Sequence, residues 1–284
     1  MITKPGVYTM PAAAYHEDPV ENGSLSHTGA VMLLPPSCPA KYFHRQCNPE
    51  PPSEVFDVGK AAHELVLRGV NAVTVIDHDS WRTKAAQAAK TLAYAQGKIP
   101  LLTAQWQRVE DMAAALYEHK AAAALLRGGK PEQALVWRDS GIWRRALLDF
   151  LPDRDTDSMY GVEYKTCLSA HPDAISRALW ERRYCQQGPY YQDGMHSLGL
   201  TGERDVPFYF IMQEKEPPYI VTIAQMKPDA IKWGRVLNAK AIEVYKRCVA
   251  TGRWGGYTDD VVGVSLPTYA EYQLDAMMES EVSA

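Results

Sequence analysis

The hydrophobic pattern of this chain changes period near residue 129, and that change restricts the fold more than any other feature. Alanine and leucine recur at helical spacing over residues 79–97 and 103–129, which predicts two helices. Beyond "GGKP" the helical period ends, and apolar runs of strand length lie within residues 132–139 and 142–151, with "DSG" between them. Two such runs on either side of a short polar turn predict a β-hairpin, in which side chains follow a period of two. Helices therefore give way to strands at this point.

Further elements follow from the same reading, and they complete an α/β order. We expect a helix over residues 53–69, with Ser53 as its cap and Gly69 at its end. After the hairpin we expect, in order, a strand over 159–166, a helix over 171–199 interrupted at Gly188-Pro189, strands over 206–214 and 219–226, and a helix over 228–252. The order of helices, three strands, helix, two strands and helix predicts one α/β domain.

The ends of the chain differ in composition from this central part. Residues 1–55 are rich in Pro, Gly, Ser and His, so we expect an extended N-terminal arm with one short helix near "SHTGAVMLL". The regular domain then covers residues 56–270, and residues 271–284 form a C-terminal tail.

Composition excludes several classes of protein. With 284 residues, of which 46% are hydrophobic, the chain can bury a full core. A net charge of −4 gives no global basic signal, so contact with nucleic acid would need a local patch. No apolar run approaches the length of a membrane span and no secretion signal is seen, so we expect a soluble, intracellular protein. The five cysteines contain no C-x-x-C pair, which argues against disulfides, zinc and an iron-sulfur cluster.

The stretch "YGVEYKT" places opposite charges on one side of a predicted strand. Residues two apart in a strand share a face, so Glu163 and Lys165 project together. Asp149 ends the apolar strand that should pair with this one, and two close, half-buried carboxylates repel by on the order of several kcal/mol unless a proton or a divalent cation intervenes. Oxygen ligands suit Mg²⁺ or Mn²⁺. Lys165 would then orient or deprotonate a water beside a metal-held phosphate. The alternative is an ordinary pair of charges on a solvent-facing strand.

Asp149 followed by Glu163-Tyr164-Lys165 resembles the D…(D/E)-x-K pattern of the PD-(D/E)XK nuclease superfamily. That resemblance implies a mixed central β-sheet flanked by helices. "VGKAAHELVL" is similar to the G-x-x-x-H helix of the RecB-like branch and carries over His63; "PEQALVW" carries over Glu132. "RRYCQQGPYYQDG" resembles the Q-x-x-x-Y motif of that branch. Its spacing selects Gln187 with Tyr191.

Both ends of the chain extend the resemblance to one group. "YFIMQEKEPPYIVTI", "CVATGRWGGY" and "VSLPTY" are similar to the C-terminal half of exonuclease VIII (RecE-type) domains carried by phages and prophages, and "YHEDP…LSHTGAVMLLPPSCPAKYF" looks like their arm. The resemblance implies an Mg²⁺-dependent exonuclease that resects duplex DNA ends 5′ to 3′ in recombination. It also implies a single-strand annealing partner, a ring-shaped homo-oligomer and a location in the cytoplasm of a bacterial host.

The resemblance also implies a role for each residue. One or two Mg²⁺ ions, which Mn²⁺ would replace, would be held by His63, Glu132, Asp149 and Glu163, with the carbonyl of Tyr164 as a further ligand. Lys165 would position the attacking water. Gln187 and Tyr191 would contact DNA near the scissile phosphate or brace the site.

Each of these residues also has an ordinary structural explanation. His63 could be a core or capping histidine, Glu132 a solvated carboxylate and Tyr191 simple packing. The cluster Arg177, Trp180, Arg182 and Arg183 could bind phosphates or form a solvated helix face. The acidic run Asp153, Asp155 and Asp157 is interpreted as a solvated turn. Two other functional classes stay open: a structure-specific or restriction-type endonuclease, and an inactive DNA-binding member of the fold.

Overall fold

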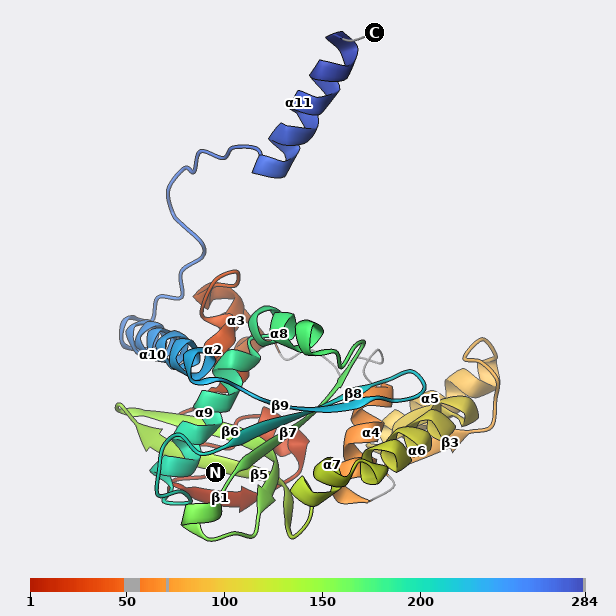
Figure 1. Cartoon of the computed structure of the whole chain (residues 1–284). Helices are drawn as coiled ribbons and strands as arrows, with labels where there is room; N and C mark the ends of the chain where they lie inside the picture. The colour runs from red at the N-terminus through yellow and green to blue at the C-terminus, as the bar shows by residue number, and fades with distance from the viewer. Residues whose placement is uncertain (49–56, 70–71, 283–284) are drawn as a thin grey trace.

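The computed structural model describes residues 1–48, 57–69 and 72–282 (Figure 1). Its strands are β1 Gly6–Thr9, β2 Leu25–Ser26, β3 Val73–Ile76, β4 Ile99–Leu102, β5 Gly129–Asp139, β6 Ile142–Pro152, β7 Gly161–Cys167, β8 Phe208–Glu214 and β9 Val221–Gln225. Its α-helices are α1 Ala12–His16, α2 His27–Met32, α3 Pro39–Cys47, α4 Asp57–Arg68, α5 Lys84–Ala95, α6 Thr103–Glu118, α7 Lys120–Leu125, α8 Pro172–Glu181, α9 Tyr184–Ser197, α10 Pro228–Thr251 and α11 Thr268–Val282.

The central sheet is mixed, as the sequence predicts. Its strands lie in the order β1-β5-β6-β7-β8-β9, and β2 pairs with β6. The pairs β5–β6, β6–β7 and β8–β9 are antiparallel, whereas β7–β8 and β2–β6 are parallel. The parallel pair β7–β8 is linked through α8 and α9, because parallel neighbours need a crossover connection. The predicted hairpin of β5 and β6 is confirmed.

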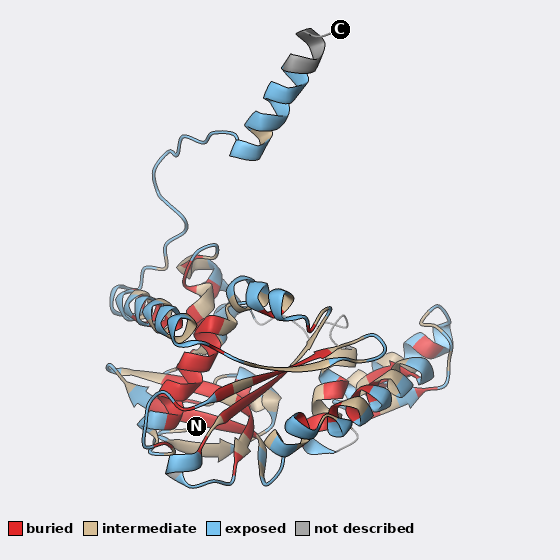
Figure 2. Cartoon of the chain, viewed as in Figure 1, coloured by how far each residue is buried: buried red, intermediate tan, exposed pale blue. Residues whose placement is uncertain are grey.

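Helices cover both faces of the sheet, which gives the strands two buried sides. On one face α9 packs against β5 and β6, and α10 and α2 pack behind it (Figure 1). On the other face α4 and α6 share a second core with Val162 and Tyr164 of β7. Strand β8 sends Phe210 to the first core and Ile211 to the second, which explains its nearly continuous apolar run. Buried residues accordingly concentrate in the sheet and in α9 (Figure 2).

The N-terminal arm is more regular than its composition predicts. Residues 1–48 contain β1, α1, β2, α2 and α3, so the expectation of one short helix is wrong. Composition alone misses these elements because long-range contacts fix them: β1 pairs with β5, and Leu25 lies in the first core. Arg145 of β6 also hydrogen-bonds Ser24 and forms an ion pair with Asp18 at 2.7 Å.

The helix predicted over residues 171–199 breaks at a different place from the one expected. Arg183, with φ of 57°, separates α8 from α9, whereas Gly188-Pro189 lies inside α9 without ending it. Proline at 189 removes the N–H that would bond the carbonyl of Cys185. An ideal Cβ on Gly234 of α10 would lie 1.7 Å from that carbonyl oxygen. The Cys185 carbonyl, which Pro189 leaves without its helical partner, therefore lies where α10 crosses closely over α9.

Other differences lie at the ends and in a peripheral unit. The helix predicted over 103–129 is two helices, because the His119 side chain accepts a hydrogen bond from Ala122 N and caps α7. Strands β3 and β4 form a separate parallel pair that the sequence reading did not predict. Ser53, the proposed cap, lies outside the described residues. No helix in the described ranges is long and apolar enough to span a membrane.

The C-terminal tail is helical. Helix α11 begins at Thr268 and extends away from the rest of the chain (Figure 1), and Tyr269, Tyr272, Met277 and Met278 are exposed on it.

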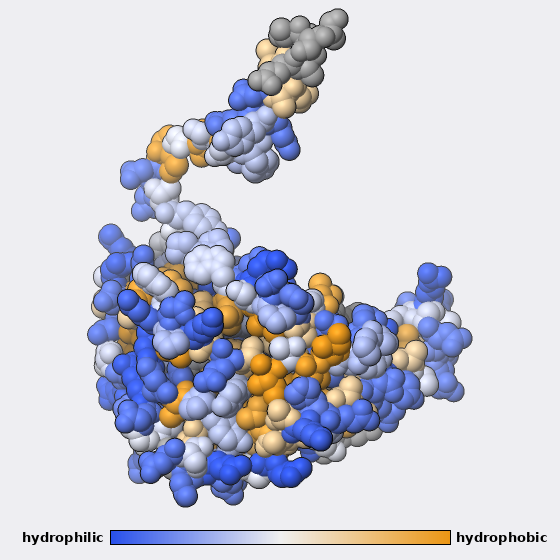
Figure 3. Space-filling model, in the orientation of Figure 1, coloured by the Kyte–Doolittle hydropathy of each residue, from blue (hydrophilic) through white to orange (hydrophobic). Residues whose placement is uncertain are grey.

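On the face shown in Figure 3, hydrophobic atoms gather over β8 and β9 within a mostly hydrophilic surface. Ile220 beside β9 is exposed, and Val221 and Ile223 are half-buried.

Replacing Gly234 with alanine tests the close crossing of α9 and α10. Alanine in a helix interior normally stabilises by about 0.5–1 kcal/mol relative to glycine. Here the added methyl group must displace the α9 backbone, so we expect Gly234→Ala to destabilise the protein by about 1–3 kcal/mol in urea denaturation. Gly255→Ala, where a Cβ meets nothing within 4 Å, is the control. A neutral or stabilising Gly234→Ala would contradict the close approach.

Candidate active site

The two central strands place their carboxylates side by side. In the β5–β6 ladder Pro131 pairs with Phe150 and Gln133 with Leu148, so Glu132 and Asp149 face each other at an interruption of the ladder. Glu132 has φ of 45°, in the left-handed region that non-glycine residues avoid. Such strain costs on the order of 1–3 kcal/mol and clusters at functional sites. Both side chains are buried.

Helix α4 brings His63 to these carboxylates. Its Nε2 lies 2.9 Å from Asp149 Oδ1, and its Nδ1 lies 3.6 Å from Glu132 Oε1. Burial alone would lower the pKa of His63, but the neighbouring carboxylates, Asp149 above all, raise it to about 9. The ring is thus an imidazolium that offsets buried negative charge.

Asp149 is held from both sides. Its Oδ1 contacts His63, and its Oδ2 accepts a hydrogen bond from the backbone N–H of Tyr164 at 2.8 Å. Burial would raise the pKa of Asp149, yet His63, Lys165 and the Tyr164 N–H together hold it below its usual value. Asp149 is therefore the ionised member of the carboxylate set.

Glu163 has a different environment on the next strand. Its Oε1 accepts hydrogen bonds from Lys165 Nζ at 2.5 Å and from Gln187 Nε2 at 2.6 Å. Burial and then Asp149 raise the pKa of Glu163 to about 7, against the opposing effect of Lys165. Burial would lower the pKa of Lys165, but Glu163 and Asp149 raise it. Lys165 is accordingly a permanent cation beside a carboxylate that accepts protons readily.

Helix α9 braces Glu163 from the opposite side of the cluster. Gln187 Nε2 lies within hydrogen-bonding distance of both Glu163 and the hydroxyl of Tyr191, the latter at 3.2 Å. Both residues are buried, and they lie one helical turn apart, which places them on one face. The structure thus joins the predicted glutamine and tyrosine to the predicted carboxylate.

The Tyr164 side chain turns away from the other predicted site residues. Its hydroxyl donates to Gln213 Oε1 at 2.6 Å, and Gln213 donates to the carbonyl of Met112. The ring belongs to the second core. The predicted role of the Tyr164 carbonyl as a ligand remains a prediction.

The sequence reading missed one residue that binds a carboxylate of the cluster and another that packs beside it. Arg68, at the end of α4, places Nη2 3.0 Å from Glu132 Oε2. Arg68 lies five residues after His63 in the same predicted helix, so the sequence offered a signal that this arginine could reach the same carboxylates. His27 of α2 packs edge-on against Tyr191, with the ring centroids 6.3 Å apart, and burial followed by the charge of Lys165 lowers the pKa of His27 to about 3. His27 is far along the chain from the predicted motifs, so no sequence pattern linked it to them.

The donor atoms suit a divalent cation, although within the described residues they do not already form a metal-binding cage. Carboxylate oxygens and an imidazole nitrogen are ligands that Mg²⁺ or Mn²⁺ accepts, and Glu163 Oε2 is buried with no hydrogen-bond partner in the described part of the chain. Across the described ranges, no three His, Cys, Asp or Glu side chains already form a metal-binding group. Here His63, Arg68 and Lys165 offset the carboxylates instead. A metal would have to replace part of that pairing, chiefly the His63–Asp149 contact.

The predicted basic cluster and the predicted acidic turn are not part of this carboxylate cluster. The Arg183 guanidinium stacks 3.9 Å from the Trp180 ring centroid and donates to Pro35 O, so it braces the arm. Asp153, Asp155 and Asp157 are exposed.

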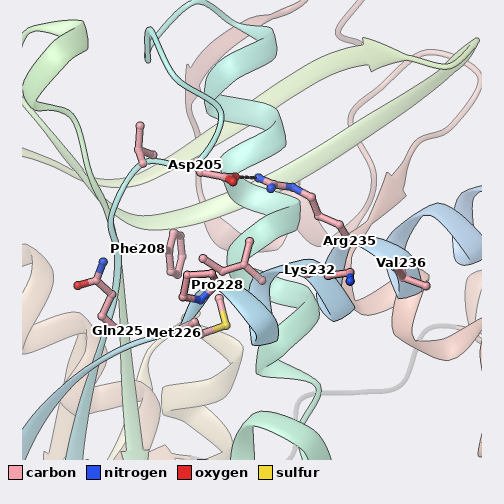
Figure 4. A pocket seen from close by; sticks show the side chains of 10 residues that line it. Asp205, Phe208, Gln225, Met226, Pro228, Lys232, Arg235 and Val236 are labelled. Carbon is pink, nitrogen blue, oxygen red and sulfur yellow. Dashed lines mark ion pairs between the residues drawn. The ribbon is translucent and has the colours of Figure 1, made fainter.

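A cavity of about 520 Å³ opens at the start of α10, where Asp205 pairs with Arg235 (Figure 4). None of the predicted site residues lines that cavity.

A mixed sheet that presents Asp149 and the Glu-x-Lys strand beside a helical histidine defines the class of PD-(D/E)XK-like proteins. The model of one family, the PDDEXK-like domain of unknown function (DUF3799), matches residues 33–262. The chain belongs to this family.

Comparison with solved structures agrees on the fold. A crystal structure from Eubacterium rectale, whose description as an exonuclease is provisional, superposes with a TM-score of 0.60 and 12% sequence identity. The match covers 92% of this chain and 97% of the other. At that identity the likeness concerns the fold alone. No curated protein matches the chain.

Removing the Lys165 ammonium tests the charge balance without reference to activity. Lys165→Met leaves Glu163 buried without its cation, and breaking a buried pair costs about 3–5 kcal/mol. We expect that loss in the free energy of unfolding to develop as the pH is raised above the Glu163 pKa of about 7, where this carboxylate is ionised and not protonated. The double variant Glu163→Gln with Lys165→Met should recover most of it, because no unpaired charge remains. Equal stability of the two variants would rule out the pairing.

Proposed function

We propose that this protein is a divalent-metal-dependent deoxyribonuclease that degrades DNA from duplex ends. One observation carries the proposal: side chains from α4, β5, β6, β7 and α9, far apart in the sequence, meet in one buried acidic cluster beside an ammonium group. Membership of a PDDEXK-like family supports a nuclease. The exonuclease description of the Eubacterium rectale protein favours action at ends.

Each residue of the cluster would have a distinct part in hydrolysis. His63, Glu132, Asp149 and Glu163 would hold the cation, which when bound supplies positive charge against the phosphate and acidifies water. The Tyr164 N–H fixes the orientation of Asp149, and Gln187 fixes Glu163.

Lys165 would act on the attacking water. Its ammonium would donate a hydrogen bond to the oxygen of that water and offset charge that develops on the phosphate. Attack breaks the bond between phosphorus and the 3′ oxygen, so the products carry 5′ phosphates.

The finer assignment rests on the sequence resemblance to exonuclease VIII domains. It comprises Mg²⁺ as the cation with Mn²⁺ as its substitute, resection from 5′ to 3′, and a role in phage-type recombination beside a single-strand annealing protein. It also includes a ring-shaped homo-oligomer that encloses DNA, working in the cytoplasm of a bacterial host.

Matched variants on end-labelled linear duplex with Mg²⁺ test the activity. Asp149→Asn and Lys165→Ala should each lower the cleavage rate by about 10³-fold or more, since each removes charge from the reacting centre. Asp153→Asn and Lys130→Ala alter the same residue types at exposed positions and should cleave like wild type. Unchanged degradation by both site variants would reject the assignment, and cutting of closed circular DNA would instead favour an endonuclease.

Metal affinity gives a separate test. Glu163→Gln keeps the shape of the side chain but removes its charge, so calorimetric Mn²⁺ affinity should fall by about tenfold or more. Asp153→Asn is again the control. Chelation by EDTA should stop cleavage by wild type. Wild-type Mn²⁺ affinity in Glu163→Gln would contradict its role as a ligand.

A further inference from the structure

The C-terminal segment, residues 254–284, carries charge of one sign. It contains six Asp and Glu and no Lys or Arg, whereas residues 1–253 contain 30 Lys and Arg against 28 Asp and Glu. The tail alone therefore makes the net charge of the chain negative. A segment of this kind repels other acidic surfaces and is attracted to basic ones.

The start of the tail is fixed to helix α3. The Trp254 ring stacks on Phe43 with the ring centroids 5.1 Å apart. The Tyr257 hydroxyl accepts a hydrogen bond from Lys41 Nζ at 2.6 Å. Residues 258–267 can span about 35 Å when extended, and in Figure 1 they carry α11 clear of the rest of the chain. The anchor thus directs the helix outward.

Helix α11 presents aromatic rings and carboxylates to solvent. Tyr269 and Tyr272 are 67% and 70% exposed, and they lie one helical turn apart. Glu271 and Asp275 are also exposed, and their spacing of four places them on one face. A helix of 15 residues without tertiary contacts is marginal in water, because most helical stability comes from packing. A surface that covers these rings would therefore stabilise α11.

The exposed side of α10 offers the opposite charge. Lys232, Val236 and Lys240 recur every four residues, so they form one stripe, and all three are exposed. The Lys232 ammonium lies 5.8 Å from the ring centroid of Trp233, which is 61% exposed. We call this stripe with Trp233 the basic face of α10. The exposed charged residues of α10 are Lys232, Lys240, Lys246 and Arg247 against Asp229 and Glu243.

The cavity of about 520 Å³ gives the basic face an apolar recess. Phe208 and Met226 line the cavity and are buried, and Lys232 and Val236 line it from α10 (Figure 4). Its volume falls within the range of about 300–1,000 Å³ that ligand pockets occupy, so a tyrosine ring fits. An aromatic side chain in a recess with charges around it is the usual centre of a protein interface.

We propose that α11 of one copy docks along the basic face of α10 in a second copy. Tyr269 and Tyr272 would lie against the recess, and Glu271 and Asp275 beside the lysines. The lengths agree, because α11 and the stretch 232–247 are each about 23 Å long at the α-helical rise. The inference goes beyond the nuclease chemistry and does not depend on it.

The symmetry of such a contact follows from its two different surfaces. Each copy gives its α11 and receives that of another copy, so the contact is head-to-tail. It closes either as a reciprocal exchange between two copies or as a ring. The contact therefore supplies an interface for the ring under the proposed function.

Paired charge reversals in the full-length protein test the contact. The face variant carries Lys232→Glu with Lys240→Glu, and the tail variant carries Glu271→Lys with Asp275→Lys. We expect wild type to sediment as two or more copies at micromolar concentration. Each variant should raise the dissociation constant by about 100-fold or more, because like charges then meet across the contact.

A matched control and a mixture identify the occupant. Lys98→Glu with Lys120→Glu reverses exposed lysines outside α10 and α11 and should associate like wild type. An equimolar mixture of the face and tail variants should associate again, because each tail then meets opposite charge on the other chain. A chain with all four reversals should also associate with itself. Circular dichroism confirms that each variant is folded.

Three results would overturn the inference: a monomeric wild type, a face or tail variant with wild-type association, or a mixture that stays monomeric. Docking of the tail on its own chain, or on a different protein, predicts a monomeric wild type. Sedimentation does not depend on cleavage. A monomer that cleaves DNA would thus overturn this inference alone, and an assembly that cleaves no DNA would overturn only the proposed nuclease function.

Discussion

The burial of Asp149 and Glu163 on adjacent strands is the constraint around which the rest of the site is arranged. Two carboxylates in a shared apolar setting repel, and the fold answers with cations and donors from both of its layers. His63 comes from the helix on one face, and Gln187 comes from the helix on the other. Lys165 lies on the same strand as Glu163. The charge balance in the absence of metal is therefore built from every layer of the molecule.

That balance also accounts for the unequal behaviour of the two acids. Asp149 has an imidazolium and a backbone N–H, which favour its ionised form. Glu163 bonds through one oxygen only and leaves the other unpartnered in the described structure. Asp149 is thus ionised, whereas Glu163 can gain or lose a proton near neutral pH. When Glu163 loses its proton, the site can bind a cation in exchange without moving its backbone. This property fits the proposed chemistry better than it fits a purely structural cluster.

Much of this arrangement could be predicted from the sequence, and the limits have physical causes. Strong periodicity gave the β5–β6 hairpin, β7 to β9 and α10, and the i, i+2 spacing put Lys165 beside Glu163. The break between α8 and α9 falls at Arg183, which no local sequence pattern marks. Pro189 lies inside α9 without ending it, and the close packing of Gly234 against Cys185 is a tertiary contact that the local sequence does not show. His27 escaped notice because long-range contacts, including the pairing of β2 with β6, set its position beside Tyr191. Contacts across more than a hundred residues leave no mark on a local pattern.

The N-terminal strands have a consequence for how the domain can be divided. The family match begins at residue 33, yet β1 lies along β5 as the outermost strand of the sheet. A fragment trimmed to the match would leave the β5 main chain with an open row of donors and acceptors, and would uncover apolar side chains that Leu25 now shields. Bare sheet edges invite chain-to-chain association. The segment ahead of the family match thus also protects the sheet edge against chain-to-chain association.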